Sequence, residues 1–326
     1  MLQLLLGGSG SGKTTLLYQR IRARAEKGEK SILLVPEQFT SSTEGRIYRE
    51  LGDALSGMVE SFSFTSLAEK ILSTEGGAAV QTLSDAGRAV LVRRALEELQ
   101  DNVHYYHRHR RSAAFCQMAA QTIDELKSAG LSGRQLAQLA GACGAESGKL
   151  SELALIFQGY ETLLARSGMD PSDRLELAGA RLEEALARHS LPEFLRDRAV
   201  FIDEFDTFNA PKKRLLGAML AALPSVTVAL CDDGAPLLPG DLSLFSGAKQ
   251  VAAQLRQLAR KNGAEVAVPQ LLRKDLRHRN APGLAAVAEL LETGSCTADA
   301  PAGEVRLFAA PSREEEARAA AGAIRR

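Results

Sequence analysis

The stretch LQLLLGGSGSGKTT, residues 2–15, decides the fold of this chain. Its apolar run at residues 2–6 predicts a buried strand that enters a tight glycine loop, and a helix is expected from Lys13 to about Lys27. The loop fits the pattern G-x-x-x-x-G-K-[ST] between a strand and a helix, which is the context that makes the match meaningful. The residues expected to bind a nucleotide are Gly7, Gly8, Ser9, Gly10, Ser11, Gly12, Lys13 and Thr14.

The chemistry of phosphate explains the residue types in this loop. Glycines let the backbone wrap around a phosphate so that successive N–H groups point at it, and the positive end of the following helix adds to the attraction. Lys13 is expected to reach the β- and γ-phosphates of ATP, and Thr14 is expected to offer its hydroxyl to Mg²⁺. A glycine-rich turn before a helix is the alternative, but such a turn needs neither the lysine nor the threonine at these positions.

A pair of carboxylates follows a later apolar run, VFIDE at residues 200–204. Asp203 is expected to hold the Mg²⁺ shell from the end of a neighbouring strand. Glu204 is the candidate catalytic residue, placed to orient and polarise an attacking water, which favours hydrolysis over transfer to a small hydroxyl acceptor. The structural alternative is a polar strand end at which Asp203 and Asp206 cap the next helix.

Strand-like and helical segments alternate along both ends of the chain. Further buried strands are expected at residues 31–36, 58–64, 199–203 and 225–231, and helices at about 211–222 and 247–261. Such an alternation is typical of a parallel sheet that helices cover on both faces. The sequence therefore predicts an α/β fold of the P-loop NTPase kind.

The middle of the chain has a different texture. Between about residues 83 and 195 strand-like runs disappear, and apolar residues recur at three- and four-residue spacing. This block predicts helices near 84–99, 113–129, 148–167 and 172–189. After it the sheet pattern resumes, and a last strand at 303–310 is expected before a helix at 313–326. Because the pattern stops in that helix, we expect the chain to be a piece of a longer protein.

Composition places limits on location and partners. Lys+Arg and Asp+Glu both number 40, so no net field draws the chain to nucleic acid, and any such contact must be local. No apolar run approaches the roughly 18–20 residues of a membrane span, which predicts a cytoplasmic protein with no membrane partner. The cysteines are far apart and form no CxxC pair, so we expect reduced packing residues at Cys116, Cys143, Cys231 and Cys296.

Two other segments have weaker interpretations. LSGRQ at residues 131–135 superficially matches the LSGGQ motif of ABC transporter ATPases, but it lies far upstream of Asp203, and Ser132 is explained as a helix cap. HYYHRHRR at residues 104–111 is interpreted as a solvated basic loop. A contact with the DNA backbone and a metal site at its histidines are the alternatives.

Several segments together resemble the superfamily 1 DNA helicases. The glycine loop, LLVPEQFTSS (33–42), ESFSFTSLAEKIL (60–72) and VFIDEFDTFN (200–209) occur in the order of motifs I, Ia, Ib and II of that superfamily. Within it, LVPEQ, SFSFTSLA and DPSDRLELA (170–178) are similar to segments of the B subunits of bacterial AddAB helicase–nucleases. The resemblance runs over essentially the whole chain, and its motifs are individually short but collectively specific.

The resemblance implies a division of the chain. Residues 1–82 and 196–302 are expected to form a RecA-like motor domain, residues 83–195 an inserted all-helical subdomain, and residues 303–326 the start of a truncated second motor domain. In that family the absent C-terminal region carries a nuclease domain and an iron–sulfur cluster, to which none of the cysteines of this chain can be assigned.

The resemblance also implies an activity. Proteins of this kind bind ATP and Mg²⁺, act as ATP-dependent helicase/deoxyribonuclease components in a heterodimer with an A subunit, and process DNA double-strand breaks for recombinational repair. Their substrates are duplex ends and single-stranded DNA, and the B subunit helps to recognise a regulatory sequence. For this chain the candidate DNA contacts are Ser61, Ser63 and Thr65, with a polar strand-to-helix cap as the alternative.

Two departures from the superfamily pattern leave other functions open. Motif III usually carries an aspartate–glutamine pair, whereas VALCDDG (228–234) has no glutamine. Catalytic arginines normally come from the second motor domain, so this fragment should bind nucleotide better than it hydrolyses it. An ATP-binding DNA-recognition scaffold with a degenerate motor is therefore an alternative to an active motor, and an unrelated P-loop ATPase or kinase is a third possibility.

Overall fold

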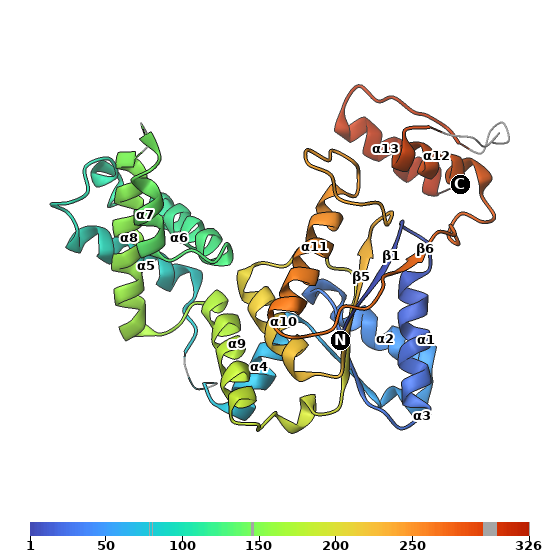
Figure 1. Cartoon of the computed structure of the whole chain (residues 1–326). Coiled ribbons are helices and arrows are strands. Elements are labelled where there is room, and N and C mark those ends of the chain that lie inside the picture. The colour runs from blue at the N-terminus through green and yellow to red at the C-terminus, as the bar shows by residue number, and fades with distance from the viewer. Residues whose placement is uncertain (78, 80, 145–146, 296–304, 326) are drawn as a thin grey trace.

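The computed structural model describes residues 1–77, 79, 81–144, 147–295 and 305–325. Its centre is a six-stranded sheet of order β3-β2-β4-β5-β1-β6, in which every neighbouring pair is parallel (Figure 1). The strands are β1 (Leu2–Gly7), β2 (Ser31–Leu34), β3 (Val59–Phe62), β4 (Ala199–Ile202), β5 (Ser225–Cys231) and β6 (Gln270–Leu272). The predicted α/β class, with a parallel sheet flanked by helices, is confirmed.

Helices pack on both faces of this sheet because successive residues of a buried strand point to opposite sides. Leu5, Leu33 and Phe201 point to one face and share a core with the first helices of the chain. That face is covered by α1 (Lys13–Ala25), α2 (Thr40–Leu51) and α3 (Asp53–Ser56). The opposite face packs against α4 (Phe64–Glu75), α9 (Pro171–Ala187), α10 (Ala210–Ala222) and α11 (Ser246–Lys261).

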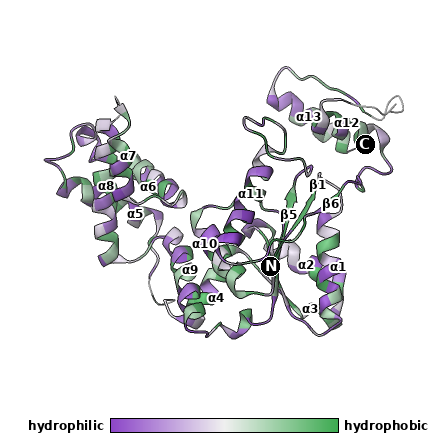
Figure 2. Ribbon diagram, viewed as in Figure 1, coloured by the Kyte–Doolittle hydropathy of each residue, from purple (hydrophilic) through white to green (hydrophobic). Residues whose placement is uncertain are grey.

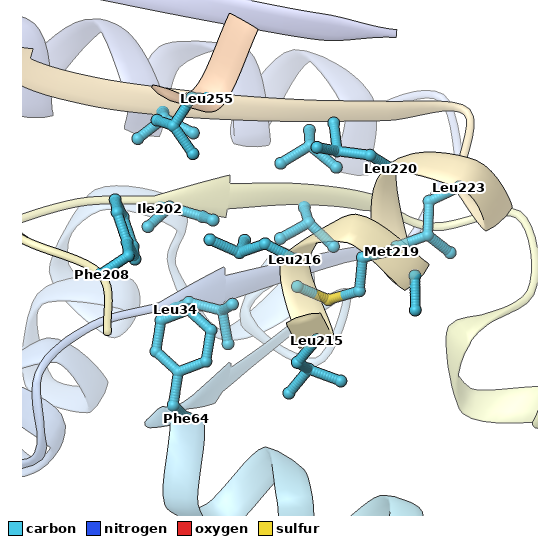
Figure 3. Packing of buried hydrophobic residues seen from close by; sticks show 14 of the residues in the cluster. Leu34, Phe64, Ile202, Phe208, Leu215, Leu216, Met219, Leu220, Leu223 and Leu255 are labelled. Atoms are coloured by element: carbon cyan, nitrogen blue, oxygen red, sulfur yellow. The ribbon is translucent and has the colours of Figure 1, made fainter. Parts of the chain in front are cut away.

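The core of the second face centres on α10. Leu216 and Met219 of this helix are fully buried and point toward Leu34 and Ile202 of the sheet, with Phe64 of α4 closing the cluster from the side (Figure 3). The hydrophobic colour that follows β1 and β5 in Figure 2 is the same core seen along the strands. The sheet is thus held by apolar burial on both sides, and its ends are left for polar residues.

A second core lies in the inserted helices. It is formed by α5 (Asp85–Glu98), α6 (Ala113–Ser128), α7 (Gly133–Ala140) and α8 (Ser147–Ser167), with Val92, Phe157 and Tyr160 at its centre. These helices stand apart from the sheet in Figure 1. By contrast, Ala178 and Leu182 of α9 belong to the core of the sheet. This packing favours an end of the helical unit near Ser167, earlier than the residue 195 that the sequence suggested.

The chain enters and leaves the helical unit along one short parallel bridge. Leu83 donates its N–H to the carbonyl of Met169 at 2.9 Å, and Met169 donates its own to that of Gln81 at 3.0 Å. Beside the bridge Lys127 of α6 binds Asp170 at 2.7 Å, and the Tyr160 hydroxyl also donates to Asp170. The two linkers are therefore fastened to each other where the unit joins the sheet.

The C-terminal part of the chain differs from its sequence-based prediction. The strand expected at 303–310 is not formed: residues 305–310 have no strand partner, Leu307 is fully exposed, and residues 303 and 304 lie outside the described part. A strand-like local sequence is not sufficient for a strand, because the backbone needs the hydrogen bonds of a neighbouring strand. The sequence did not reveal β6 or α12 (Pro282–Thr293), whereas the predicted terminal helix is present as α13 (Arg313–Ile324).

The cysteines only partly fit the packing interpretation. Cys116 is buried in the helical core, but Cys143 and Cys231 are exposed because each lies at or beyond the end of its element, and all three are free thiols. Cys296 lies outside the described residues. Over the described ranges, no helix is long and apolar enough to cross a membrane.

Truncation of one central side chain tests the packing at α10. Leu216→Ala removes a fully buried side chain and is expected to lower the free energy of unfolding by about 2–5 kcal/mol. The matched control is Leu242→Ala, whose side chain is 96% exposed and whose truncation should change stability by less than about 0.5 kcal/mol. Urea unfolding of both variants gives the comparison, and equal effects would contradict the packing described here.

Candidate nucleotide site

The glycine loop lies at the carboxyl edge of the sheet, between the end of β1 at Gly7 and the start of α1 at Lys13. Its backbone needs glycine at two points, since Gly10 has φ 80° and Gly12, the residue before the helix, has φ 89°. A side chain at either position would be strained. The loop therefore joins the end of β1 to the N-terminus of α1. This is the strand–loop–helix arrangement that the sequence predicted for Gly7 to Thr14.

Lys13 crosses the mouth of the loop. Its Nζ donates to the carbonyl oxygens of Gly7 and Gly8, both at 2.8 Å. Burial lowers the pKa of this ammonium group, while the nearby Cys231 and Asp203 oppose that shift. A partly buried cation held at the loop by two neutral carbonyls is placed to exchange them for phosphate oxygens, which bind it more strongly.

Thr14 and Asp203 are brought together from distant parts of the sequence. The N–H of Asp203 donates to the carbonyl of Leu34 at 3.1 Å, which fixes Asp203 just beyond β4. Asp203 is 6% exposed, and burial raises the pKa of its carboxyl although a side-chain hydrogen bond with Thr14 acts in the other direction. A carboxylate and a hydroxyl side by side are oxygen ligands that suit Mg²⁺, so these two residues fit the ion that the sequence predicted.

Glu204 occupies a strained backbone position next to Asp203. Its φ is 64°, a left-handed conformation that costs energy in a residue other than glycine, and strain of this kind clusters at functional sites. The Glu204 side chain is exposed, and its pKa is raised by partial burial and by the charge of Asp203, with Arg46 opposing. Glu204, Asp203 and Thr14 all line a cavity of about 220 Å³.

Arg46 of α2 is a residue of this cavity that sequence analysis missed. Its guanidinium lies 4.9 Å from the ring centre of Tyr18 in α1, and it acts electrostatically on both Asp203 and Glu204. The only signal in the sequence was its place in the helix that follows the second strand. The structure thus provides a cation within this chain that faces both carboxylates.

A second missed group comes from the segment after β6. That segment crosses the loop: Leu276 donates its N–H to the Gly10 carbonyl at 3.0 Å, and Arg277 Nη1 donates to Ser9 Oγ at 2.9 Å. A cavity of about 390 Å³ opens between Gly8, Asp232 and Glu292 of α12. The basic run RKDLRHR, residues 273–279, was the available signal, but nothing in the sequence tied it to the glycine loop.

The turn after β5 lies beside the glycine loop. Asp232 donates its N–H to the Gly7 carbonyl at 3.3 Å, and its carboxylate accepts from the N–H of Gly234 at 2.7 Å. Asp233 pairs with Lys249 of α11 at 3.3 Å. Both carboxylates therefore shape a turn beside the glycine loop.

The predicted DNA contacts lie within β3 and just beyond it, at the same edge of the sheet, and are not gathered at the glycine loop. Ser63 is 4% exposed and caps α4, because its Oγ accepts the N–H of Ser66 at 3.1 Å. The cap that was the alternative is therefore present for Ser63. Thr65 is exposed and donates to Glu37 Oε1 at 2.8 Å, whereas Ser61 is half-buried within β3.

The structure also shows where the two weaker motifs, residues 131–135 and 104–111, lie. Ser132 caps α7 through the N–H of Gln135 at 3.4 Å, as its cap interpretation required. The histidines of residues 104–111 form no metal cluster: among the described residues no group of three or more His, Cys, Asp or Glu side chains is arranged to hold a metal ion.

Comparison with known proteins gives a consistent picture. The family described as "ADDB, N-terminal" matches residues 4–288. Proteins named as the B subunit of an ATP-dependent helicase/deoxyribonuclease match over the whole chain, with 34% identity in Desulforudis audaxviator, 33% in Moorella thermoacetica and 32% in Symbiobacterium thermophilum. The chain spans 28% of the length of the first of these relatives and 29% of the other two.

The raised pKa of Asp203 predicts a stability that depends on pH. The fold favours the protonated carboxyl, so its contribution to stability is present below the ordinary aspartate pKa and is lost as the pH rises through the raised value. Asp203→Asn removes this loss of stability, because asparagine does not ionise. In urea unfolding with EDTA, we expect the variant to gain stability over wild type as the pH rises above about 4, while the exposed Asp206→Asn does not. If Asp203→Asn is no more stable than wild type at neutral pH, the ionised Asp203 carboxylate does not destabilise the fold and the prediction is wrong.

Proposed function

Because the chain belongs to the AddB N-terminal family, we propose that it forms the helicase-like ATP-binding region of the B subunit of an ATP-dependent helicase/deoxyribonuclease. The single observation that carries the proposal is the meeting of Lys13 and Thr14 in the glycine loop with Asp203 beyond β4. In parallel α/β sheets, ligands bind at the carboxyl ends of the strands, and this cluster lies there.

Each side chain has a chemical role in this proposal. The loop from Gly7 to Gly12 offers backbone N–H groups to phosphates, and Lys13 exchanges its bonds to the Gly7 and Gly8 carbonyls for phosphate oxygens. Thr14 and Asp203 hold Mg²⁺, which supplies charge neutralisation when bound. Glu204 orients the attacking water from its exposed position beside Asp203.

Arginines within this chain add to the predicted set. Arg277 lies against Ser9 of the loop at 2.9 Å, and Arg46 faces both carboxylates. Both are cations at the rim of a phosphate site, where positive charge stabilises a nucleotide. They support nucleotide binding by this chain, whereas the arginines expected from a second motor domain remain necessary for full turnover.

The roles of the longer protein are part of the proposal. We propose that the complete protein pairs with an A subunit, acts on duplex ends and single strands of DNA, and processes double-strand breaks for recombinational repair in the cytoplasm. Residues 303–326 would begin the second motor domain. The nuclease domain and the iron–sulfur cluster belong to the C-terminal region of the family. Ser61 and Thr65 stay candidate DNA contacts, whereas Ser63 contributes through its cap on α4.

A scaffold that binds ATP with little unwinding is the second candidate. The turn at Asp232 and Asp233 favours it, because these carboxylates bond to Gly234 and Lys249 where a motor of the superfamily carries its glutamine. An unrelated P-loop kinase is not supported by the family match.

Removal of the loop cation tests nucleotide binding. Lys13→Ala is expected to weaken the affinity for a fluorescent ATP analogue with Mg²⁺ by roughly tenfold or more, because a charged hydrogen-bond donor to phosphate is removed. Lys27→Ala, an exposed lysine just after the same helix, is the matched control and should bind as wild type does. Equal affinity of the two variants, with both folded, would contradict the proposed site.

Substitution of the water-orienting carboxylate separates the motor from the scaffold. In the complete complex, Glu204→Gln is expected to slow the ATP turnover at this site roughly 10²–10⁴-fold, with the nucleotide affinity little changed. Turnover is measured against Glu29→Gln, a control on an exposed loop. If turnover and unwinding by the complex are unchanged, the scaffold is the better description.

A further inference from the structure

An aromatic pocket lies at the far end of the helical unit, away from the nucleotide site. It has a volume of about 430 Å³ and lies between the loop before α6, the first turns of α6 and the start of α8. Among the described residues its lining consists of Tyr105, Tyr106, His109, Ala114, Phe115, Met118 and Lys149, none of which is acidic. The basic loop of residues 104–111 thus contributes aromatic rings to a defined cavity.

A buried carboxylate holds this loop in one shape. Glu152 of α8 is 6% exposed, and its two oxygens accept the N–H groups of His104 at 2.7 Å, of Tyr105 at 2.9 and 3.0 Å, and of Tyr106 at 3.3 Å. Consecutive backbone N–H groups that converge on one anion fix the local backbone. The backbone of this loop is therefore fixed by specific hydrogen bonds. A loop that is only solvated would not need a buried carboxylate to hold it.

The rings form a platform open to solvent. Tyr106 stacks on Phe115 with ring centres 5.4 Å apart and planes at 29°, and His109 lies 5.5 Å from the same phenylalanine at 31°. Tyr105 is 57% exposed and packs against Gly148, where a side chain would clash with its ring, and Met118 is also 57% exposed. Aromatic faces left open beside a stacked pair can accept a further flat ring.

Positive charge surrounds the platform. Lys149 lines the pocket, and Arg108 and Arg111 are exposed on the loop without an ion pair within the described ranges. Arg110 contacts His107 at 3.3 Å and has no carboxylate partner among these residues. Glu152, the carboxylate that holds the loop backbone, is buried, and its oxygens already accept backbone N–H groups. The complementary ligand is consequently flat and anionic.

We propose that this pocket is a stacking site for an unpaired base of single-stranded DNA, with the surrounding arginines contacting the adjacent phosphates. Unpaired nucleic acid offers both flat bases and a charged backbone, and sites of this kind combine aromatic platforms with cationic grooves. An acidic helix of a protein partner would also find positive charge here, but it has no need of open ring faces. The inference rests on the proposed DNA-processing function and adds a contact site that lies apart from the nucleotide.

The test measures base stacking directly. Binding of a single-stranded oligonucleotide that carries 2-aminopurine is followed by anisotropy and by the quenching of the base on stacking. Tyr105→Ala is expected to weaken binding roughly tenfold and to reduce the quenching, while Tyr105→Phe keeps both because the ring remains. Tyr48→Ala, a tyrosine of α2 that is 59% exposed, is the matched control and should bind as wild type does.

The electrostatic part has its own control. Arg108→Ala with Arg111→Ala should lower the slope of log affinity against log salt by about 0.7 for each phosphate that the variant no longer neutralises. Arg22→Ala, an exposed arginine on α1, should not. Fully duplex DNA, which has no unpaired base, should be insensitive to Tyr105→Ala.

Three outcomes would overturn the proposal. The first is that Tyr105→Ala and Tyr48→Ala bind the single-stranded oligonucleotide with equal affinity. The others are that the wild-type protein does not quench the 2-aminopurine, or that it does not bind the single strand. Loss of binding to a purified A subunit with DNA affinity unchanged would assign the pocket to a protein instead. The ATP-analogue affinity of the same variants separates this inference from the proposed function, since Tyr105→Ala should leave it unchanged and Lys13→Ala should not.

Discussion

The parallel pairing of β1 with β5 on one side and β6 on the other is the constraint on which the site depends. In this register Gly7 lies opposite Cys231 and Leu272, so the glycine loop, the turn after β5 and the segment after β6 leave the sheet at one edge. The pairing holds because Leu4 and Leu5 are each fully buried, on opposite faces. Apolar burial along the strands thereby places Lys13, Asp203 and Asp232 together just beyond the strand ends.

The carboxylates at this edge of the sheet differ in their exposure to solvent. Asp203 is nearly buried and Glu204 beside it is exposed, although they are neighbours in the chain. The left-handed backbone at Glu204 makes this difference possible, since it turns the chain sharply after β4. One carboxylate is thus enclosed beside the glycine loop, and the other meets solvent.

Local patterns predicted the first strand, the glycine loop and the helical block, and they predicted one ion site for Thr14 and Asp203, which the structure brings together. They did not predict Arg46, Arg277, β6 or α12, because these residues reach the loop only through tertiary packing that no local spacing encodes. The strand expected at 303–310 is not formed, and residues 305–310 have no partner strand among the described residues. For α9 the helix was predicted correctly, but its apolar face packs on the sheet core and not on the helical block. Periodicity reveals which face is apolar, but not what covers it.

The bridge between Thr82 and Met169 affects how the chain folds. Strand β4 pairs with β2 and β5, yet the whole helical unit separates it in sequence from β3. Closing so long a loop from an extended chain delays the formation of a sheet, because contact between distant segments must precede any gain. Two backbone hydrogen bonds at the bridge join the ends of the insertion. Once the inserted helices have collapsed on their own core, the connection that remains between β3 and β4 is reduced to α4, α9 and their linkers, which lowers the cost of closing it.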